Sequence, residues 1–199
     1  MQLYTDLTVS YNVVNPNDRQ LVDRIVNGES RAFAVVIQNT EKLVSQIVYR
    51  MISIPADRGD IAQDVYLKAF QKLKDFRFQC KLSTWIGQIA YNTCLKYLEK
   101  KRLLYLEDLS VAADAAGQED PGAEPIFSQN QVSGILRETV DKLAPVYRTL
   151  VVLFHLEELS YEEIATITGL PQGTIKSYLF RARRQLKDML LSNYKREEL

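Results

Sequence analysis

Apolar residues recur every three or four positions along most of the chain, which is the period of one face of an α-helix. Two such runs open the pattern, a short one over residues 21–26 and a longer one over residues 33–51. Asn27-Gly28 ends the first run and Pro55 follows the second, as expected of residues that stop helices. The amino-terminal part of the chain is therefore predicted to be helical.

Two further helices are predicted before residue 103. The third is expected to begin at Asp57 or Asp60, because a carboxylate suits the first turn of a helix, and a loop over residues 75–82 follows it. Ser83 is the expected N-cap of the fourth helix, which ends in basic residues at 100–102. The residues of the third helix that we expect to face the core are Ile61, Val65, Leu67, Ala69, Phe70 and Leu73.

The helical period fades between residues 103 and 132, where Ala, Gly, Asp and Pro accumulate. A stretch of about 30 residues is long for a loop inside a compact fold, which favours a flexible linker over a surface loop. The predicted fold class is all-α, with two small helical domains over residues 17–102 and 133–199. Residues 1–16 are then an N-terminal extension.

The second domain carries the pattern of a helix-turn-helix. Pro145 is placed as the first residue of one helix, and Ser160 with Glu163 matches a capping box at the start of a shorter one. Gly169 follows where a left-handed turn residue is needed. The next helix has apolar residues at intervals of four, three and four, which are Ile175, Leu179, Ala182 and Leu186.

Charge is segregated along the chain although its formal net charge is zero. Residues 1–102 hold 15 basic and 10 acidic side chains, and residues 103–132 hold six acidic and no basic ones. Residues 133–199 hold 10 basic and 9 acidic side chains. Within them, residues 174–187 hold five basic and no acidic ones, and this basic face on the second helix of a helix-turn-helix favours contact with DNA phosphates over a merely solvated surface.

Several classes of protein are disfavoured by what the sequence lacks. Cys80, Cys94 and the single His155 do not provide four ligands for a structural zinc or a nucleophile–histidine set, and no Gly-rich phosphate loop is present. The first 16 residues do not have the pattern of a signal peptide, and no run approaches the ~20 apolar residues of a membrane span. We therefore expect a cytoplasmic protein that is not an enzyme and has neither a metal nor a cofactor.

Two sets of motifs resemble one known family, the extracytoplasmic-function sigma factors of the sigma-70 family. The carboxy-terminal runs resemble region 4 of that family, and they are residues 159–165, 169–177 and 181–183. The amino-terminal runs resemble region 2, and they are residues 60–65, 69–70, 83–85 and 89–92. Both sets occur in the family's order and together span nearly the whole chain, whereas residues 1–16 have no counterpart in the common core.

The resemblance implies a subunit that binds core RNA polymerase, through the β′ clamp helices and the β flap, and helps to melt promoter DNA. It also implies that a cognate anti-sigma factor holds the protein inactive, and that the acidic linker threads a polymerase channel. Two alternatives stay open at this point. One is a helix-turn-helix regulator that binds DNA unaided, and the other is a protein-interaction module without a DNA function.

The resemblance also assigns site residues. Those implied to contact the −35 element are Thr174, Lys176, Ser177, Phe180, Arg181 and Arg184. Those implied to contact the −10 element, with aromatic rings and cations to hold unpaired bases, are Arg77, Phe78, Lys81, Tyr91, Asn92 and Lys96. Those implied to contact core polymerase are Asp60, Gln63, Asp64 and Lys68.

Overall fold

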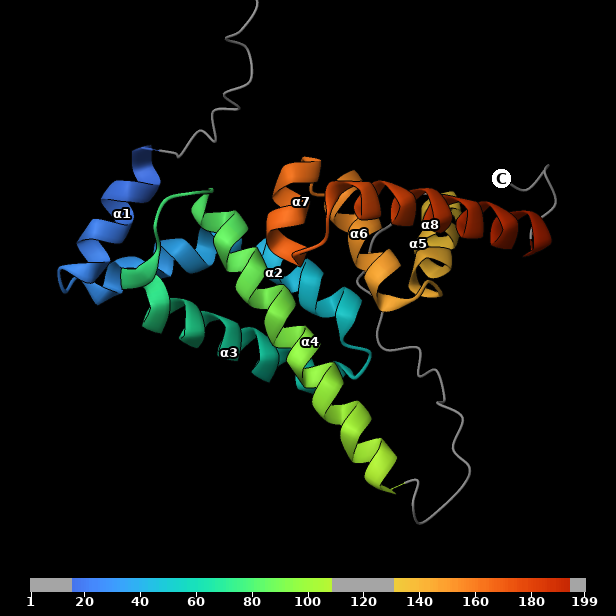
Figure 1. Ribbon diagram of the computed structural model, residues 1–199, viewed down its shortest axis with the longest axis horizontal. Coiled ribbons are helices and arrows are strands. Elements are labelled where there is room, and N and C mark those ends of the chain that lie inside the picture. Colours follow the sequence, from blue (N-terminus) through green and yellow to red (C-terminus); the bar gives the residue numbers. More distant parts are fainter. Residues whose placement is uncertain (1–15, 109–130, 194–199) are drawn as a thin grey trace, which may run out of the picture.

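The computed structural model describes residues 16–108 and 131–193, and every regular element in these two ranges is a helix (Figure 1). The first range contains α1 (Pro16–Val26), the short 3-10 helix η1 (Ser30–Ala32), α2 (Phe33–Met51), α3 (Pro55–Lys72), η2 (Leu73–Asp75) and α4 (Leu82–Asp108). The second contains α5 (Gln131–Asp141), α6 (Pro145–His155), α7 (Tyr161–Thr168) and α8 (Gln172–Asn193). The predicted all-α class is confirmed.

The starts of α3 and α4 differ from those expected. Pro55 does not merely end α2; it is the first residue of α3, where its fixed φ and missing N–H cost nothing. Ser83 lies inside the first turn of α4 and is not its N-cap. The carboxylate of Asp18 on α1 accepts a hydrogen bond from the Leu82 amide at 3.0 Å, so another helix supplies the partner for this free N–H.

The end of α4 also differs from the prediction. This helix continues to Asp108, beyond residue 102 where it was expected to end and residue 103 where the linker was expected to begin. Helix α5 begins at Gln131, just before the expected end of the linker. The remainder of the predicted linker and nearly all of the N-terminal extension lie outside the described residues.

The helix-turn-helix is built as its sequence predicts. Ser160 is the N-cap of α7: its side chain accepts from the Glu163 amide at 3.2 Å, and the Ser160 amide donates to the Glu163 carboxylate at 3.0 Å. Gly169 ends α7 with φ 72°, a left-handed conformation that glycine adopts without steric cost. The turn between α7 and α8 is therefore fixed locally.

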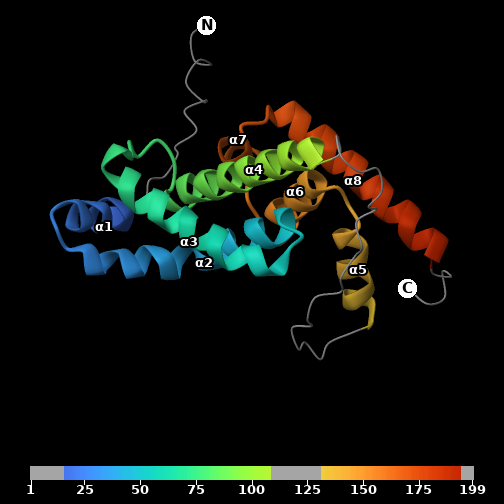
Figure 2. The ribbon, with the colours of Figure 1, turned by 90° about the horizontal axis from the view of Figure 1, so that it is seen from below.

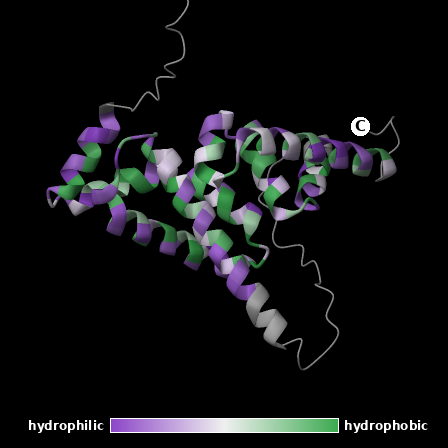
Figure 3. Cartoon of the chain, in the orientation of Figure 1, coloured by the Kyte–Doolittle hydropathy of each residue, from purple (hydrophilic) through white to green (hydrophobic). Residues whose placement is uncertain are grey.

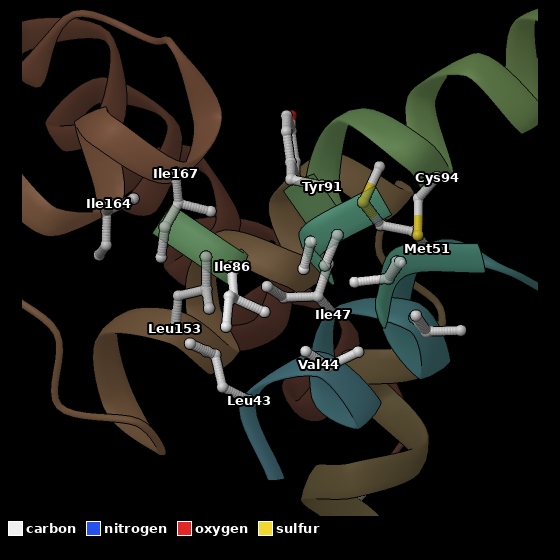
Figure 4. Close-up of a cluster of buried hydrophobic side chains, with 14 of the residues drawn as sticks. Leu43, Val44, Ile47, Met51, Ile86, Tyr91, Cys94, Leu153, Ile164 and Ile167 are labelled. Carbon is white, nitrogen blue, oxygen red and sulfur yellow. The ribbon is translucent and has the colours of Figure 1, made fainter. Parts of the chain in front are cut away.

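The two helical bodies pack against each other in this structure. Helix α7 lies on α4 and helix α6 lies on α2, so the second body covers one side of the first (Figures 1 and 2). Figure 4 shows the shared apolar cluster, in which Ile47 of α2 and Ile86 of α4 meet Leu153 of α6 and Ile167 of α7. Each of these four side chains is fully buried. The hydrophobic core therefore runs continuously through both bodies.

Two apolar residues of α3 were predicted to face the core and do not. Leu67 is 57% exposed and Phe70 is 43% exposed, whereas Ile61, Val65 and Ala69 are buried as expected. In Figure 3 the outward edge of α3 is mostly hydrophilic, so these two side chains interrupt a polar surface. Within residues 16–108 and 131–193, no helix is long and apolar enough to cross a membrane.

Candidate nucleic-acid and partner-binding interfaces

The outer face of α8 carries the six residues expected at the −35 element. Its inner face is buried, as predicted, through Ile175, Leu179, Ala182 and Leu186. On the outer face Lys176, Ser177, Phe180, Arg181 and Arg184 are exposed, and Thr174 is half-buried. The Phe180 ring is 67% exposed and lies among these polar and basic side chains. The described part of α8 thus presents a basic face with an apolar side chain in its middle.

Contacts within the second body hold this face in place. Lys176 lies over the ring of Tyr161 at 5.2 Å from its centroid, which joins the start of α8 to the start of α7. The Arg183 guanidinium lies 5.8 Å from the centroid of the Phe154 ring on α6, so this side chain contacts the second body itself. Ring stacking between Phe154 and Tyr161, at 5.0 Å, ties α6 to α7. The basic face is therefore carried on a preorganised scaffold.

The loop before α4 holds three of the residues expected at the −10 element. Arg77 and Lys81 are exposed, and Phe78 is half-buried with φ 55°, a left-handed conformation that is costly for an aromatic residue. Phe78 packs on Phe76 at 4.7 Å between ring centroids and lies under the guanidinium of Arg19 at 4.9 Å. These two contacts hold the loop in its strained shape.

The other three residues expected at the −10 element lie on α4, on two different sides of it. Asn92 and Lys96 are exposed and one turn apart. Tyr91 is only 3% exposed, so in this arrangement its ring cannot reach DNA. Burial raises the pKa of the Tyr91 hydroxyl, and the nearby hydroxyl of Tyr178 on α8 raises it further. Tyr91 therefore faces the second body.

The outward stripe of α3 carries the four residues expected to contact the polymerase. Asp60 and Gln63 are exposed, whereas Asp64 and Lys68 are half-buried and form an ion pair at 2.6 Å. Lys68 also donates to the Thr93 hydroxyl of α4 at 3.4 Å, so it links α3 to its neighbour.

The exposed Leu67 and Phe70 extend this stripe, and the sequence analysis assigned them to the core instead. Leu67 lies one turn after Gln63, so helical spacing alone could have placed it on the exposed side. Phe70 also makes a T-shaped contact with Phe33, with 5.1 Å between the ring centroids, so one part of this half-exposed ring is packed against the core. Among the described residues, no group of three or more histidine, cysteine, aspartate or glutamate side chains could hold a metal ion.

Two known families match the two bodies of this chain. The family described as "Sigma-70 region 2" matches residues 36–103, and the family described as "Sigma-70, region 4" matches residues 133–186. The first match covers most of α2, α3 and much of α4, and the second covers α6, α7 and most of α5 and α8.

Several relatives align with this chain over nearly their whole length. The chain is 31% identical to the ECF RNA polymerase sigma-E factor of Escherichia coli K12 over 176 residues, which is 85% of this chain and 92% of that one. It is 29% identical to the RNA polymerase sigma-H factor of Pseudomonas aeruginosa over 180 residues, which is 87% and 93% of the two chains. It is 29% identical to ECF sigma factor SigW of Bacillus subtilis over 184 residues, with 86% and 96% covered.

Solved structures share the fold at lower identity. The structure of CnrH in complex with the cytosolic domain of CnrY matches with a TM-score of 0.62 at 22% identity, over 89% of this chain and 99% of the other. The sigma factor RpoE of Bartonella quintana, in complex with the anti-sigma factor NepR, matches with a TM-score of 0.66 at 22% identity, over 81% and 98%. With a relative above 30% identity aligned over nearly its whole length, this chain belongs to the extracytoplasmic-function sigma factors of the sigma-70 family.

Proposed function

We propose that this sigma factor reads the −35 element with α8, reads the −10 element with α4 and the loop before it, and docks on core RNA polymerase through α3. The observation that carries the proposal is the exposed basic face of α8 over residues 174–187, a stretch with no acidic residue, supported on a capped and preorganised turn. Relatives over almost the full chain are named as RNA polymerase sigma factors, which supports promoter-directed initiation of transcription. No catalytic residue is part of the proposal.

In the proposed −35 contact, Arg181 lies on the face of α8 that enters the major groove. A guanidinium donates two parallel hydrogen bonds to guanine, which discriminates by about 1–3 kcal/mol against another base. Lys176 and Ser177 lie on the same exposed face, one turn earlier, and a lysine cannot form the same fork. Thr174 and Arg184 flank this face and are assigned to phosphates, which set the register of the helix.

In the proposed −10 contact, Asn92 reads the edge of an unpaired base, since a side-chain amide offers both a donor and an acceptor. Lys96 lies on the same exposed side of α4, and Arg77 and Lys81 on the preceding loop supply further cations for the DNA backbone. Phe78 is half-buried and held by its neighbours, so it offers an edge of its ring to a base.

In the proposed polymerase contact, the β′ clamp helices cover the outward stripe of α3. Asp60 and Gln63 provide exposed polar groups there, and the exposed Leu67 and Phe70 add apolar area that binding would remove from water. Asp64 and Lys68 contribute as an ion pair already formed in the free chain. We assign binding of the polymerase β flap to the second body. We expect the complex of sigma factor and polymerase to be cytoplasmic.

A cognate anti-sigma factor is part of the same proposal. The solved relatives CnrH and RpoE are each described in complex with a partner, which for RpoE is named as an anti-sigma factor. Co-purification from the native cell should recover such an inhibitor together with the polymerase. Repeated recovery of polymerase alone would contradict this part of the proposal.

Run-off transcription with purified core polymerase tests the main assignment. The chain should produce promoter-specific transcripts without another initiation factor, which a helix-turn-helix regulator or an interaction module cannot do. Arg181→Ala should lower initiation from −35-dependent templates about 5- to 150-fold, which is the range that corresponds to 1–3 kcal/mol. Arg183→Ala is the matched control, because it removes the same charge from a side chain that lies over Phe154.

Variants of the other two surfaces complete the experiment. Asn92→Ala should change the preference among −10 sequences while leaving −35 dependence intact. Leu67→Ala should weaken binding to core polymerase without loss of thermal stability, since its side chain is 57% exposed. Equal activity of all three variants on every template would overturn the site assignments, and failure to bind core polymerase would overturn the function.

A further inference from the structure

Two adjacent residues of α1 contact the loop before α4 at two separate points. This loop, residues 76–81, has no regular secondary structure, and we call it the −10 loop. The Asp18 carboxylate accepts a hydrogen bond from the Leu82 amide at 3.0 Å, immediately after the loop. The Arg19 guanidinium lies 4.9 Å from the centroid of the Phe78 ring, in the middle of the loop. Helix α1 therefore holds both the middle and the end of the −10 loop.

The Phe78 ring is the last member of a row of three aromatic rings. It packs on Phe76 with 4.7 Å between the ring centroids, and Phe76 packs on Trp85 of α4 with 5.1 Å between them. Phe76 is buried, whereas Phe78 is half-buried and the Arg19 that contacts it is exposed. The row thus runs from α4 outwards, and Arg19 contacts its last ring.

The −10 loop needs this support because its backbone is strained at Phe78. The φ of 55° is a left-handed conformation that glycine adopts freely and that the β-carbon of a phenylalanine disfavours. A residue stays in such a conformation only where its surroundings over-determine it. The surroundings that hold the ring here are Phe76 on one side of the contact chain and Arg19 on the other. Loss of either contact should therefore let the loop relax.

Helix α1 is itself anchored on the first body. Its apolar side chains Leu21, Val22 and Ile25 are buried in the hydrophobic core. It also packs on η2, which directly precedes the −10 loop. Asp18 and Arg19 lie near the start of α1, where they reach the loop from an element that the core holds in place.

We infer that α1 takes part in recognition of the −10 element: Asp18 and Arg19 are positioning residues that hold the −10 loop in its strained shape, so that an unpaired base meets a preformed surface. The loop is then ordered before DNA binds, and the entropy of ordering it does not weaken binding. Support of the loop by α1 is a property of the free chain, and only its effect on −10 recognition rests on the proposed function.

Tryptophan fluorescence of the full chain tests the Arg19 contact without polymerase or DNA. Trp85 is the only tryptophan in the sequence, so its fluorescence reports on the aromatic row. Arg19→Ala should increase quenching of this fluorescence by acrylamide, because a relaxed loop leaves the indole more accessible. Arg24→Ala is the matched control, since it removes the same charge from an exposed arginine of α1 that pairs with Glu29 instead. Equal quenching of the two variants would overturn positioning by Arg19.

Hydrogen exchange at the start of α4 tests the Asp18 contact. Asp18→Ala removes the acceptor, so the Leu82 amide should exchange about fivefold faster, which corresponds to about 1 kcal/mol for a lost N-terminal cap. Asp18→Asn keeps a side-chain oxygen that accepts, and should restore slow exchange. Asp23→Ala, at an exposed aspartate of the same helix, is the matched control. Unchanged exchange in Asp18→Ala would overturn positioning by Asp18.

Binding of a fork-junction template tests the effect on −10 recognition. The template carries the run-off promoter with one strand of its −10 element unpaired, and it is bound by the complex of the chain with core polymerase. Arg19→Ala and Asp18→Ala should each weaken binding about 2- to 5-fold, which corresponds to about 0.5–1 kcal/mol. Asp18→Asn and the two control variants should bind like the parent.

A double-mutant cycle with Phe78 separates positioning from a direct contact of Arg19 with DNA. If Arg19 acts through the ring, Arg19→Ala should cause no further loss of template binding in a Phe78→Ala chain. A phosphate contact would instead be lost by the same factor in both chains, would lower the salt dependence of binding, and would overturn the positioning role.

The outcomes distinguish this inference from the proposed function. A loosened loop with unchanged template binding would overturn the role of α1 in −10 recognition. A chain whose loop is held by Asp18 and Arg19 but which never supports run-off would refute the proposed function and leave the support of the loop standing.

Discussion

Replacement of Asp141 by Asn isolates the most buried of the ion pairs between the two bodies. The Arg50 side chain is only 6% exposed, its Nε atom has no hydrogen-bond partner, and Asp141 is the carboxylate that pairs with it. Asp141→Asn keeps the size of the side chain but leaves a buried guanidinium without a counter-charge. Loss of one partner of a buried pair costs about 3–5 kcal/mol. In a chain of this length each 1 kcal/mol lowers the melting temperature by about 2–4 °C, so the expected decrease is about 6–20 °C.

Substitution of the other partner, Arg50, should lower the free energy of unfolding by less, because the two side chains are not equally buried. Arg50→Met removes the buried cation and leaves Asp141, whose side chain is 33% exposed and keeps contact with water. Urea unfolding followed by circular dichroism measures both variants against the parent. If Asp141→Asn lowers the free energy of unfolding by less than about 1 kcal/mol, the Arg50 guanidinium is not a buried unpaired charge in that variant, and the reasoning is refuted. A larger loss for Arg50→Met than for Asp141→Asn would also refute it.

Three further predictions concern local features. Ser160→Ala should lower the free energy of unfolding by about 1 kcal/mol, measured in urea, because it removes the N-cap of α7; an unchanged value would contradict the cap. Burial opposes ionisation of Glu163, but hydrogen bonds from Lys81 and Ser160 outweigh it and lower its pKa, so the stabilisation is complete above the ordinary pKa and is lost as the pH falls through the lowered one. Thermal melts should therefore separate the parent from Glu163→Gln at about pH 7, and the difference should shrink as the pH falls below the ordinary pKa of glutamate. Burial raises the pKa of the Cys94 thiol to about 12, so iodoacetamide should label Cys80 first and Cys94 after denaturation, as read by mass spectrometry.

Local chemistry made much of this fold predictable from the sequence. The capping box of Ser160 and Glu163, the left-handed Gly169 and the proline at the start of α6 each act within a few residues, so their geometry is encoded where they stand. The periodic burial of α8 follows from the same local logic, since one face must pack on neighbouring helices and the other stays in water. The exposed basic residues of that helix, Arg181 among them, were therefore predicted correctly as surface residues.

Tertiary packing decided the remaining features. Asp18, and not the expected N-cap Ser83, accepts from the first turn of α4, at the Leu82 amide, because α1 folds against that end of the helix, and no local spacing encodes such a contact. Leu67 and Phe70 are 57% and 43% exposed although both are apolar, so their hydrophobicity alone did not indicate their direction.

The relation between the two bodies was likewise decided in three dimensions. The sequence by itself determined two helical bodies of unequal charge, and their order, because helical period and charge are read residue by residue. It did not determine that Tyr91 lies buried beneath the second body. That burial depends on the close contact between Gly87 and Ile167, which are about 80 residues apart in the sequence. Contacts between distant segments form only when both surfaces exist, and their fit is a property of the folded molecule.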